Sequence, residues 1–149
     1  MTAAEIMTRE VVTAGPESTV EEIARLLSQH RVSGLPVVDP ERHLLGMVTE
    51  GDLVIRAARP HFPRYIPFLE GVIFLDNPRH FEEELRRMMA VTAREIMSTE
   101  VLTVSPLASL EDMATLMSER DVNRLVVVDQ DRVVGIVARA DIVRTLAAG

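Results

Sequence analysis

The chain has 149 residues, of which 47% are hydrophobic, and it carries a formal net charge of −7 and no cysteine. These values fit one compact unit or two small ones that share a core, exclude disulfide and thiol chemistry, and argue against a nucleic-acid partner, which needs a basic surface. The sequence shows no secretory signal and no apolar run near the roughly 20 residues that span a bilayer, so we expect a cytoplasmic protein without membrane insertion.

The chain is an internal duplication. Residues 3–39 align with residues 93–129 without a gap, at an offset of 90 positions. One deletion in the following turn then places Gly46 on Gly135 and Asp52 on Asp141. Such repetition predicts two supersecondary units that bury a shared core. We therefore expect an α/β (α+β) fold with one repeat over 1–58, an insert over 59–91 and a second repeat over 92–149.

The first repeat begins with a β-branched run over 10–13 that predicts a short strand. An amphipathic helix follows, and the spacing of Thr19 and Glu22 is that of a capping box at its start. The apolar runs over 35–38 and 44–49 predict a buried strand and its returning partner. A second helix is expected to begin near Thr49.

The second repeat predicts the same order of elements. A strand is expected over 100–103, and Ser109 and Asp112 have the spacing of a second capping box. Two apolar strands over 125–128 and 133–138 follow, and the last helix is expected to begin near Ala138. Each repeat is thus predicted to be β-α-β-β-α.

The insert between the repeats holds all five aromatic residues of the chain. Residues 77–90 predict a helix, with Asn77 as the N-cap and Pro78 at the first helical position. The apolar segment 65–75 either packs on its own module or forms a subunit or partner contact, because exposed apolar surface often marks such contacts.

The repeated Gly-x-x-x-x-x-Asp motif has two interpretations. Thr49 and Asp52 have the spacing of a capping box, so both can simply stabilise a helix start. Ala138 has no side-chain oxygen and cannot cap in this way, yet Asp141 is present. This asymmetry favours a separate role for the carboxylate, which can accept hydrogen bonds from two neighbouring hydroxyls of a ribose. Free amides at the helix start favour a phosphate beside it.

A nucleotide would also need a slot for its base. Neither repeat contains an aromatic ring, so a purine would lie between aliphatic side chains and be recognised by backbone groups. The segment 30–39 offers Val32 as an apolar contact, Ser33 and Gly34 with accessible backbone, and Pro36 as a stiff entry to the strand.

The whole pattern resembles a tandem pair of CBS domains, also called a Bateman module. The resemblance covers roughly 3–58 and 92–147 and rests on three stretches together, "EIMT…VVT", "HRVSGLPVVD" and "GMVTEGDL". It implies two repeats packed about a pseudo-twofold axis, with two clefts between them for an adenosine-containing ligand (AMP, ADP, ATP or S-adenosylmethionine). It also implies a regulatory homodimer that requires no cofactor and acts through an unknown effector protein.

The resemblance assigns residues of both repeats to each cleft. Cleft one would use Thr8, Thr13, Val32, Ser33, Ala138, Arg139 and Asp141, with the charge of Arg139 in place of the hydroxyl that Ala138 lacks. Cleft two would use Ser98, Thr103, Val122, Asn123, Thr49, Glu50 and Asp52. Arg124 and Val126 replace the Gly and Pro of the base slot in cleft two.

Other functions find less support in the sequence. The spacing of the four histidines (His30, His43, His61 and His80) fits no metal-binding pair, and no nucleophile elbow is present. We therefore expect neither a metal site nor catalytic residues, and hence no enzyme. A purely structural dimerisation module with empty clefts stays open as the alternative, because neither cleft matches the motif fully.

Overall fold

The computed structural model describes residues 1–58 and 91–149, and the predictions for the insert lie outside this part of the chain. Mixed helices and strands confirm the α+β class. The first half contains α1 (Ala3–Ile6), α2 (Val20–His30), β1 (Gly34–Val38), β2 (Leu44–Thr49) and α3 (Glu50–Ala58). The second half contains α6 (Ala93–Ile96), β3 (Thr103–Val104), α7 (Leu110–Arg120), β4 (Arg124–Asp129), β5 (Arg132–Ala138) and α8 (Arg139–Ala148).

The two halves have matching sheets. β1 and β2 pair antiparallel, as do β4 and β5, and each hairpin carries a register shift at the matched place, between Val37 and Val38 and between Val127 and Val128. The predicted helix starts are also present. The Thr19 hydroxyl accepts from the Glu22 amide at 3.2 Å, and the Ser109 hydroxyl accepts from the Asp112 amide at 3.0 Å.

The first predicted strand of each repeat is much shorter than expected. In the second half the Val126 amide donates to Leu102 at 3.2 Å, and β3 forms beside β4. In the first half the position of Val126 is taken by Pro36, which has no N–H to donate. Only an isolated bridge between Ala14 and Val37 remains there, so the predicted strand over 10–13 is wrong for a physical reason.

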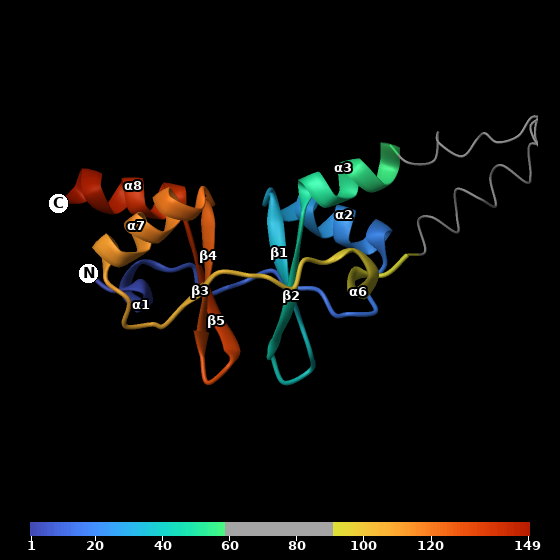
Figure 1. The fold of residues 1–149 in the computed structure, drawn as a ribbon, viewed down its shortest axis with the longest axis horizontal. Helices are drawn as coiled ribbons and strands as arrows, with labels where there is room; N and C mark the ends of the chain where they lie inside the picture. The colour runs from blue at the N-terminus through green and yellow to red at the C-terminus, as the bar shows by residue number, and fades with distance from the viewer. Residues whose placement is uncertain (59–90) are drawn as a thin grey trace, which may run out of the picture.

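The two halves exchange their first segments, which the sequence repeat did not predict. Figure 1 shows α1 beside α7 and α8 of the second half, and α6 beside α2 and α3 of the first. Ala3 is fully buried in the second half and its amide donates to Ala108 at 2.8 Å. Ala93 is fully buried in the first half and its amide donates to Ser18 at 2.8 Å. Each half therefore depends on the other for its core.

A third apolar cluster joins the halves along the pseudo-twofold axis. It consists of Val38, Met47, Val126 and Val133. Beyond it the two hairpin turns hydrogen-bond to each other, from the Leu44 amide to Asp131 at 3.1 Å and from the Val133 amide to Arg42 at 2.9 Å. The described helices include none with the length and apolarity that a membrane crossing requires.

Candidate functional site

The start of α3 forms the complete capping box that the sequence predicted for Thr49 and Asp52. One Asp52 oxygen accepts from the Thr49 amide at 2.9 Å and from its hydroxyl at 3.1 Å, and the Thr49 hydroxyl accepts from the Asp52 amide at 3.4 Å. This places the carboxylate at the first turn of the helix, next to amides without intrahelical partners.

The start of α8 keeps half of that box. Asp141 is only 6% exposed, and one of its oxygens accepts from the Ala138 amide at 2.7 Å. The other oxygen accepts from the Arg144 guanidinium. Asp141 thus still stabilises its helix without a hydroxyl at Ala138. The inference that its presence calls for a separate role is therefore weaker than the sequence suggested.

Cleft one lies between the halves and has a volume of about 380 Å³. The structure brings together five of the seven residues predicted for it: Thr8, Val32, Ser33, Ala138 and Asp141. Thr13 and Arg139 do not line it. The amide of Arg139 donates to Asn123 at 2.9 Å, and its guanidinium lies 3.5 Å from the carbonyl oxygen of Val122. The expectation that Arg139 supplies the charge in this cleft is therefore wrong, because its side chain leads away from it.

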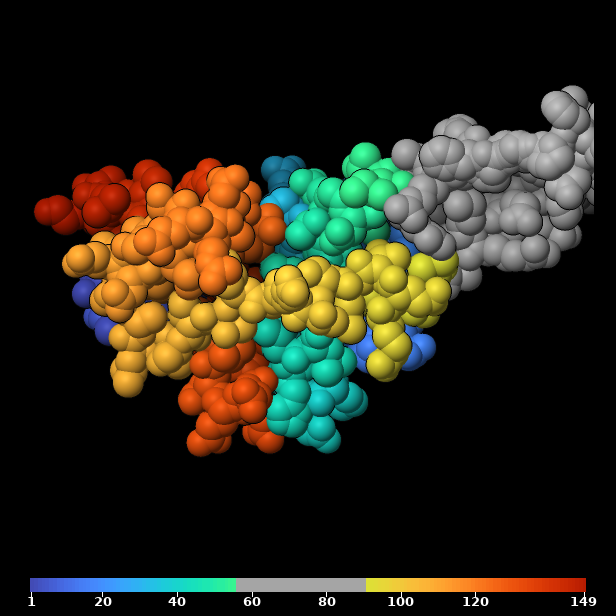
Figure 2. Space-filling view, viewed as in Figure 1, coloured from blue at the N-terminus to red at the C-terminus, as the bar shows by residue number. Residues whose placement is uncertain are grey.

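Cleft two has a volume of about 330 Å³. It lies where the segment before β3 crosses both halves, a segment that Figure 2 shows in yellow on the near face. Five of the seven predicted residues line it: Ser98, Val122, Asn123, Thr49 and Asp52. Thr103 and Glu50 do not. The Glu50 amide instead donates to the carbonyl of Ser33 at 2.8 Å, which ties α3 to the segment before β1.

Arg124 lines both clefts and lies between them. Its guanidinium donates to the Ser33 hydroxyl. It also lies so close to Gly34 that a Cβ there would be 3.0 Å from a guanidinium nitrogen. Burial lowers the pKa of Arg124, and the negative charge of Glu50 partly offsets this. Arg124, which stands where the first repeat has Gly34, thus reaches across the pseudo-twofold axis to the first half.

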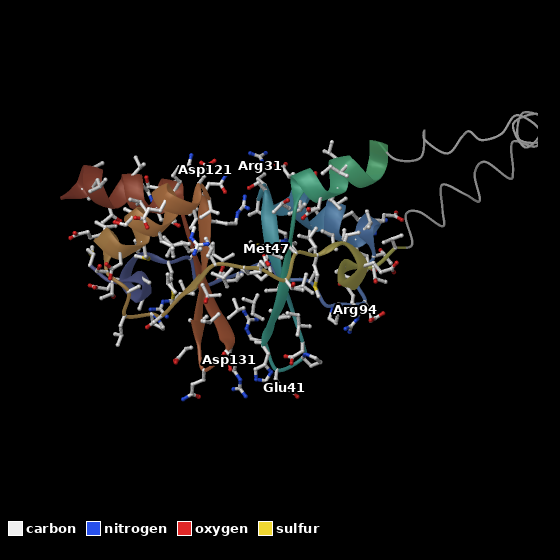
Figure 3. All side chains as sticks on the ribbon, viewed as in Figure 1. Arg31, Glu41, Met47, Arg94, Asp121 and Asp131 are labelled. Atoms are coloured by element: carbon white, nitrogen blue, oxygen red, sulfur yellow. The ribbon has the colours of Figure 1, made fainter. Side chains whose placement is uncertain are left out.

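Three further charged residues line the clefts, and the sequence argument assigned none of them to a cleft. Arg31 and Arg144 line cleft one, whereas Asp121 lines cleft two. Figure 3 shows Arg31 and Asp121 at the same end of the molecule, away from the hairpin turns. Both residues end a helix with a left-handed backbone, at φ 54° and 52°. Their matched positions in the two repeats were the signal that could have identified them.

One group of possible metal ligands lies in the turn between β1 and β2. Ligand atoms of Asp39, Glu41 and His43 lie within 4.8 Å of one another. Asp39 accepts from the amides of Glu41 and His43 at 3.0 and 2.8 Å, and its other oxygen lies 2.9 Å from His43 Nδ1. Desolvation raises the pKa of Asp39, but the hydrogen bonds from His43 outweigh it and leave the pKa below its usual value. Turn formation accounts for this arrangement.

Comparison with known proteins gives consistent matches. A CBS domain family model matches residues 3–59 and 93–148. The chain is 33% identical over 136 residues to the CBS domain-containing protein YhcV of Bacillus subtilis (strain 168), over 91% of this chain and 79% of that protein.

Solved structures show the same similarity. CBSX2 from Arabidopsis thaliana in complex with AMP matches with a TM-score of 0.75 and 25% identity, over 99% of this chain and 96% of that chain. The CBS domain pair of protein MJ0100, in complex with 5′-methylthioadenosine and S-adenosyl-L-methionine, matches with a TM-score of 0.74 and 25% identity, over 99% and 97%.

Proposed function

The chain belongs to the CBS domain family as a tandem pair, and on that premise we propose that it is a regulatory module that binds an adenosine-containing ligand between its halves. The observation that carries the proposal is the position of the two equivalent carboxylates. Asp52 and Asp141 come from different repeats, and each lines a cleft formed with the other half.

The chemistry of these clefts suits a nucleoside. A carboxylate accepts hydrogen bonds and carries two oxygens, so it can bind the vicinal hydroxyls of ribose. In cleft one, Val32 and Val12 provide aliphatic surface for a purine, and Gly34 leaves backbone accessible beside them. In cleft two, Val122 and Leu102 provide the equivalent surface. CBSX2 with AMP and MJ0100 with S-adenosyl-L-methionine are similar proteins whose ligands support this class.

Calorimetric titration tests the proposal. AMP, ADP, ATP, S-adenosylmethionine and adenosine are titrated into the wild type, Asp52→Ala and Asp141→Ala. Loss of the ribose contacts removes hydrogen bonds to a charged group and should weaken binding roughly 10- to 100-fold. Adenosine isolates this contact because it carries no phosphate.

Asp112→Ala is the matched control. Asp112 occupies the same third position of a helix, in α7, and lines neither cleft. Its removal should leave every affinity unchanged. The proposal fails if no ligand binds the wild type, or if all variants bind every ligand equally.

We further propose that the module is a homodimer. α3 and α8 lie along one edge of the molecule (Figure 1), and both helices carry exposed apolar side chains. Val54 is 67% exposed and Leu146 is 66% exposed, with Ile55 and Val143 beside them. Such a surface is typical of a protein contact. Sedimentation or light scattering should then give a dimer for the wild type and a monomer for Val54→Glu with Leu146→Glu. A monomeric wild type would contradict the dimer, and a variant that stays dimeric would contradict this surface.

Ligand and dimer surfaces share two helices. Asp52 stands in the first turn of α3 and Asp141 in the first turn of α8, so occupancy of a cleft acts on the helices of the proposed interface. The output would then be a rearrangement of the dimer or of an effector protein bound to it. A purely structural dimer with empty clefts is the alternative, and a thermal shift with adenylates separates the two, because a ligand of the folded state stabilises it.

A further inference from the structure

The two clefts carry opposite charge although they come from equivalent parts of the repeats. Cleft one is lined by three cations (Arg31, Arg124 and Arg144) and two anions (Glu10 and Asp141), a formal charge of +1. Among the described residues, cleft two is lined by the cation Arg124 and three anions (Asp52, Glu100 and Asp121), a formal charge of −2. A basic cleft in a chain of net charge −7 is a local feature that its overall composition hides.

Two matched positions create the difference. Arg31 and Asp121 have the same left-handed backbone, and both amides donate to the fourth residue before them, Leu27 and Met117. Arg31 and Asp121 therefore have the same backbone conformation and differ in the charge of the side chain. At the second position Arg144 lines cleft one, whereas its counterpart Ile55 is exposed and lines neither cleft.

The ion pair in cleft one strengthens the contrast. Arg144 pairs with Asp141, which offsets part of the negative charge of this carboxylate. Each carboxylate oxygen still has a second lone pair for a ribose hydroxyl. Arg31 and Arg124 then remain as cations against the single carboxylate of Glu10. A phosphate monoester carries about −1.5 to −2 charges at pH 7, so it is attracted here and repelled by the acidic cleft.

We infer that the clefts sort adenosine ligands by charge: cleft one takes a phosphate-bearing nucleotide, and cleft two takes an adenosine derivative whose 5′ end is neutral or cationic. This inference rests on the proposed function and adds the ligand class of each cleft. Arg31 is then the specificity residue of cleft one, and Asp121 that of cleft two.

Charge reversal at the matched positions tests this. Arg31→Asp and Asp121→Arg each introduce the residue that the same chain already holds, in the same backbone conformation, at the equivalent position. AMP and the uncharged 5′-methylthioadenosine are titrated by calorimetry, and amide chemical shifts of Val32 and Val122 identify the occupied cleft. Arg25→Asp changes the net charge equally, lies on the exposed face of α2 and lines neither cleft, so it is the control.

The expected results differ between ligands. In the wild type, AMP should change the amide chemical shift of Val32, and 5′-methylthioadenosine should change that of Val122. Arg31→Asp should weaken the affinity for AMP roughly 10- to 100-fold, whereas Arg25→Asp should leave it unchanged. Neither substitution should alter the affinity for 5′-methylthioadenosine. Asp121→Arg should allow AMP to change the amide chemical shift of Val122 as well. Higher salt should weaken the affinity for AMP but not that for 5′-methylthioadenosine.

Two outcomes overturn the inference in distinguishable ways. If AMP binds but prefers cleft two, or binds Arg31→Asp and the wild type equally, charge sorting is refuted while the proposed function stands. If neither ligand binds the wild type, the proposed function fails and the inference fails with it.

Discussion

The glycine of the repeated motif gives the sharpest stability prediction. A Cβ built on Gly46 would lie 2.7 Å from the carbonyl oxygen of Ser98 and 2.7 Å from the sulfur of Met97. Ser98 belongs to the exchanged segment, and it forms two backbone hydrogen bonds with Met47, both at 2.9 Å. A backbone carbonyl cannot give way as a flexible side chain does, so Gly46→Ala must push the exchanged segment off β2.

The expected cost follows from this contact. Overpacking of a core costs typically 1–3 kcal/mol, and each strained hydrogen bond adds up to about 1 kcal/mol. We expect Gly46→Ala to lower the free energy of unfolding by about 2–3 kcal/mol, and the Tm by roughly 4–12 °C for a chain of this size. Urea and thermal unfolding followed by far-UV circular dichroism measure both.

Gly51→Ala is the matched control with the opposite sign. Gly51 lies in the first turn of α3, and an added Cβ would meet nothing nearer than the Thr49 hydroxyl at 3.6 Å. Alanine should raise stability there by about 0.5–1 kcal/mol, because glycine is a poor helix former. The account of the exchanged segment is refuted if Gly46→Ala unfolds at or above the wild-type midpoint.

Three further predictions concern single side chains. Ala138→Thr should complete the capping box with Asp141 and stabilise the protein by about 1 kcal/mol, seen as a higher urea midpoint; no gain would contradict the capping geometry. Met113→Ala should cost about 2–5 kcal/mol because Met113 is fully buried beside Ala3, and a loss under 1 kcal/mol in the same assay would contradict this packing. The pKa of Asp39 is lower in the folded state than in the unfolded chain, so its charged form stabilises the fold above its ordinary pKa and this contribution is lost as the pH falls through the folded value. Asp39→Asn should therefore be less stable than the wild type near neutral pH and approach it under acid; a difference that persists at low pH would contradict the direction of the shift.

Local features of the fold could be predicted from the sequence. The starts of α2 and α7 follow from Thr19 and Ser109, since a cap depends on residues three positions apart. The strands β1, β2, β4 and β5 follow from continuous apolar runs. The strand over 10–13 failed because its pairing depends on an N–H that the distant Pro36 lacks, and propensity does not include the partner.

The clefts were predictable in outline, but their charge was not. The internal alignment made Asp52 and Asp141 equivalent, and the resemblance to CBS pairs put them in clefts between the halves; each lines such a cleft in the structure. The sequence could not show which arginine of α8 lines cleft one, Arg139 or Arg144. Both lie in the first turns of this helix, and the orientation of the helix decides which of them faces the cleft. Nor could the sequence show that the first segment of each repeat packs on the other half, since a repeat identifies equivalent residues and not their partners.

A crystal structure grown with saturating AMP tests the central claim most directly. The account predicts AMP in cleft one, with its ribose on Asp141, its base beside Val32 and its phosphate near Arg31. Empty clefts under saturating AMP, or AMP bound on an outer surface away from both Asp52 and Asp141, would contradict it.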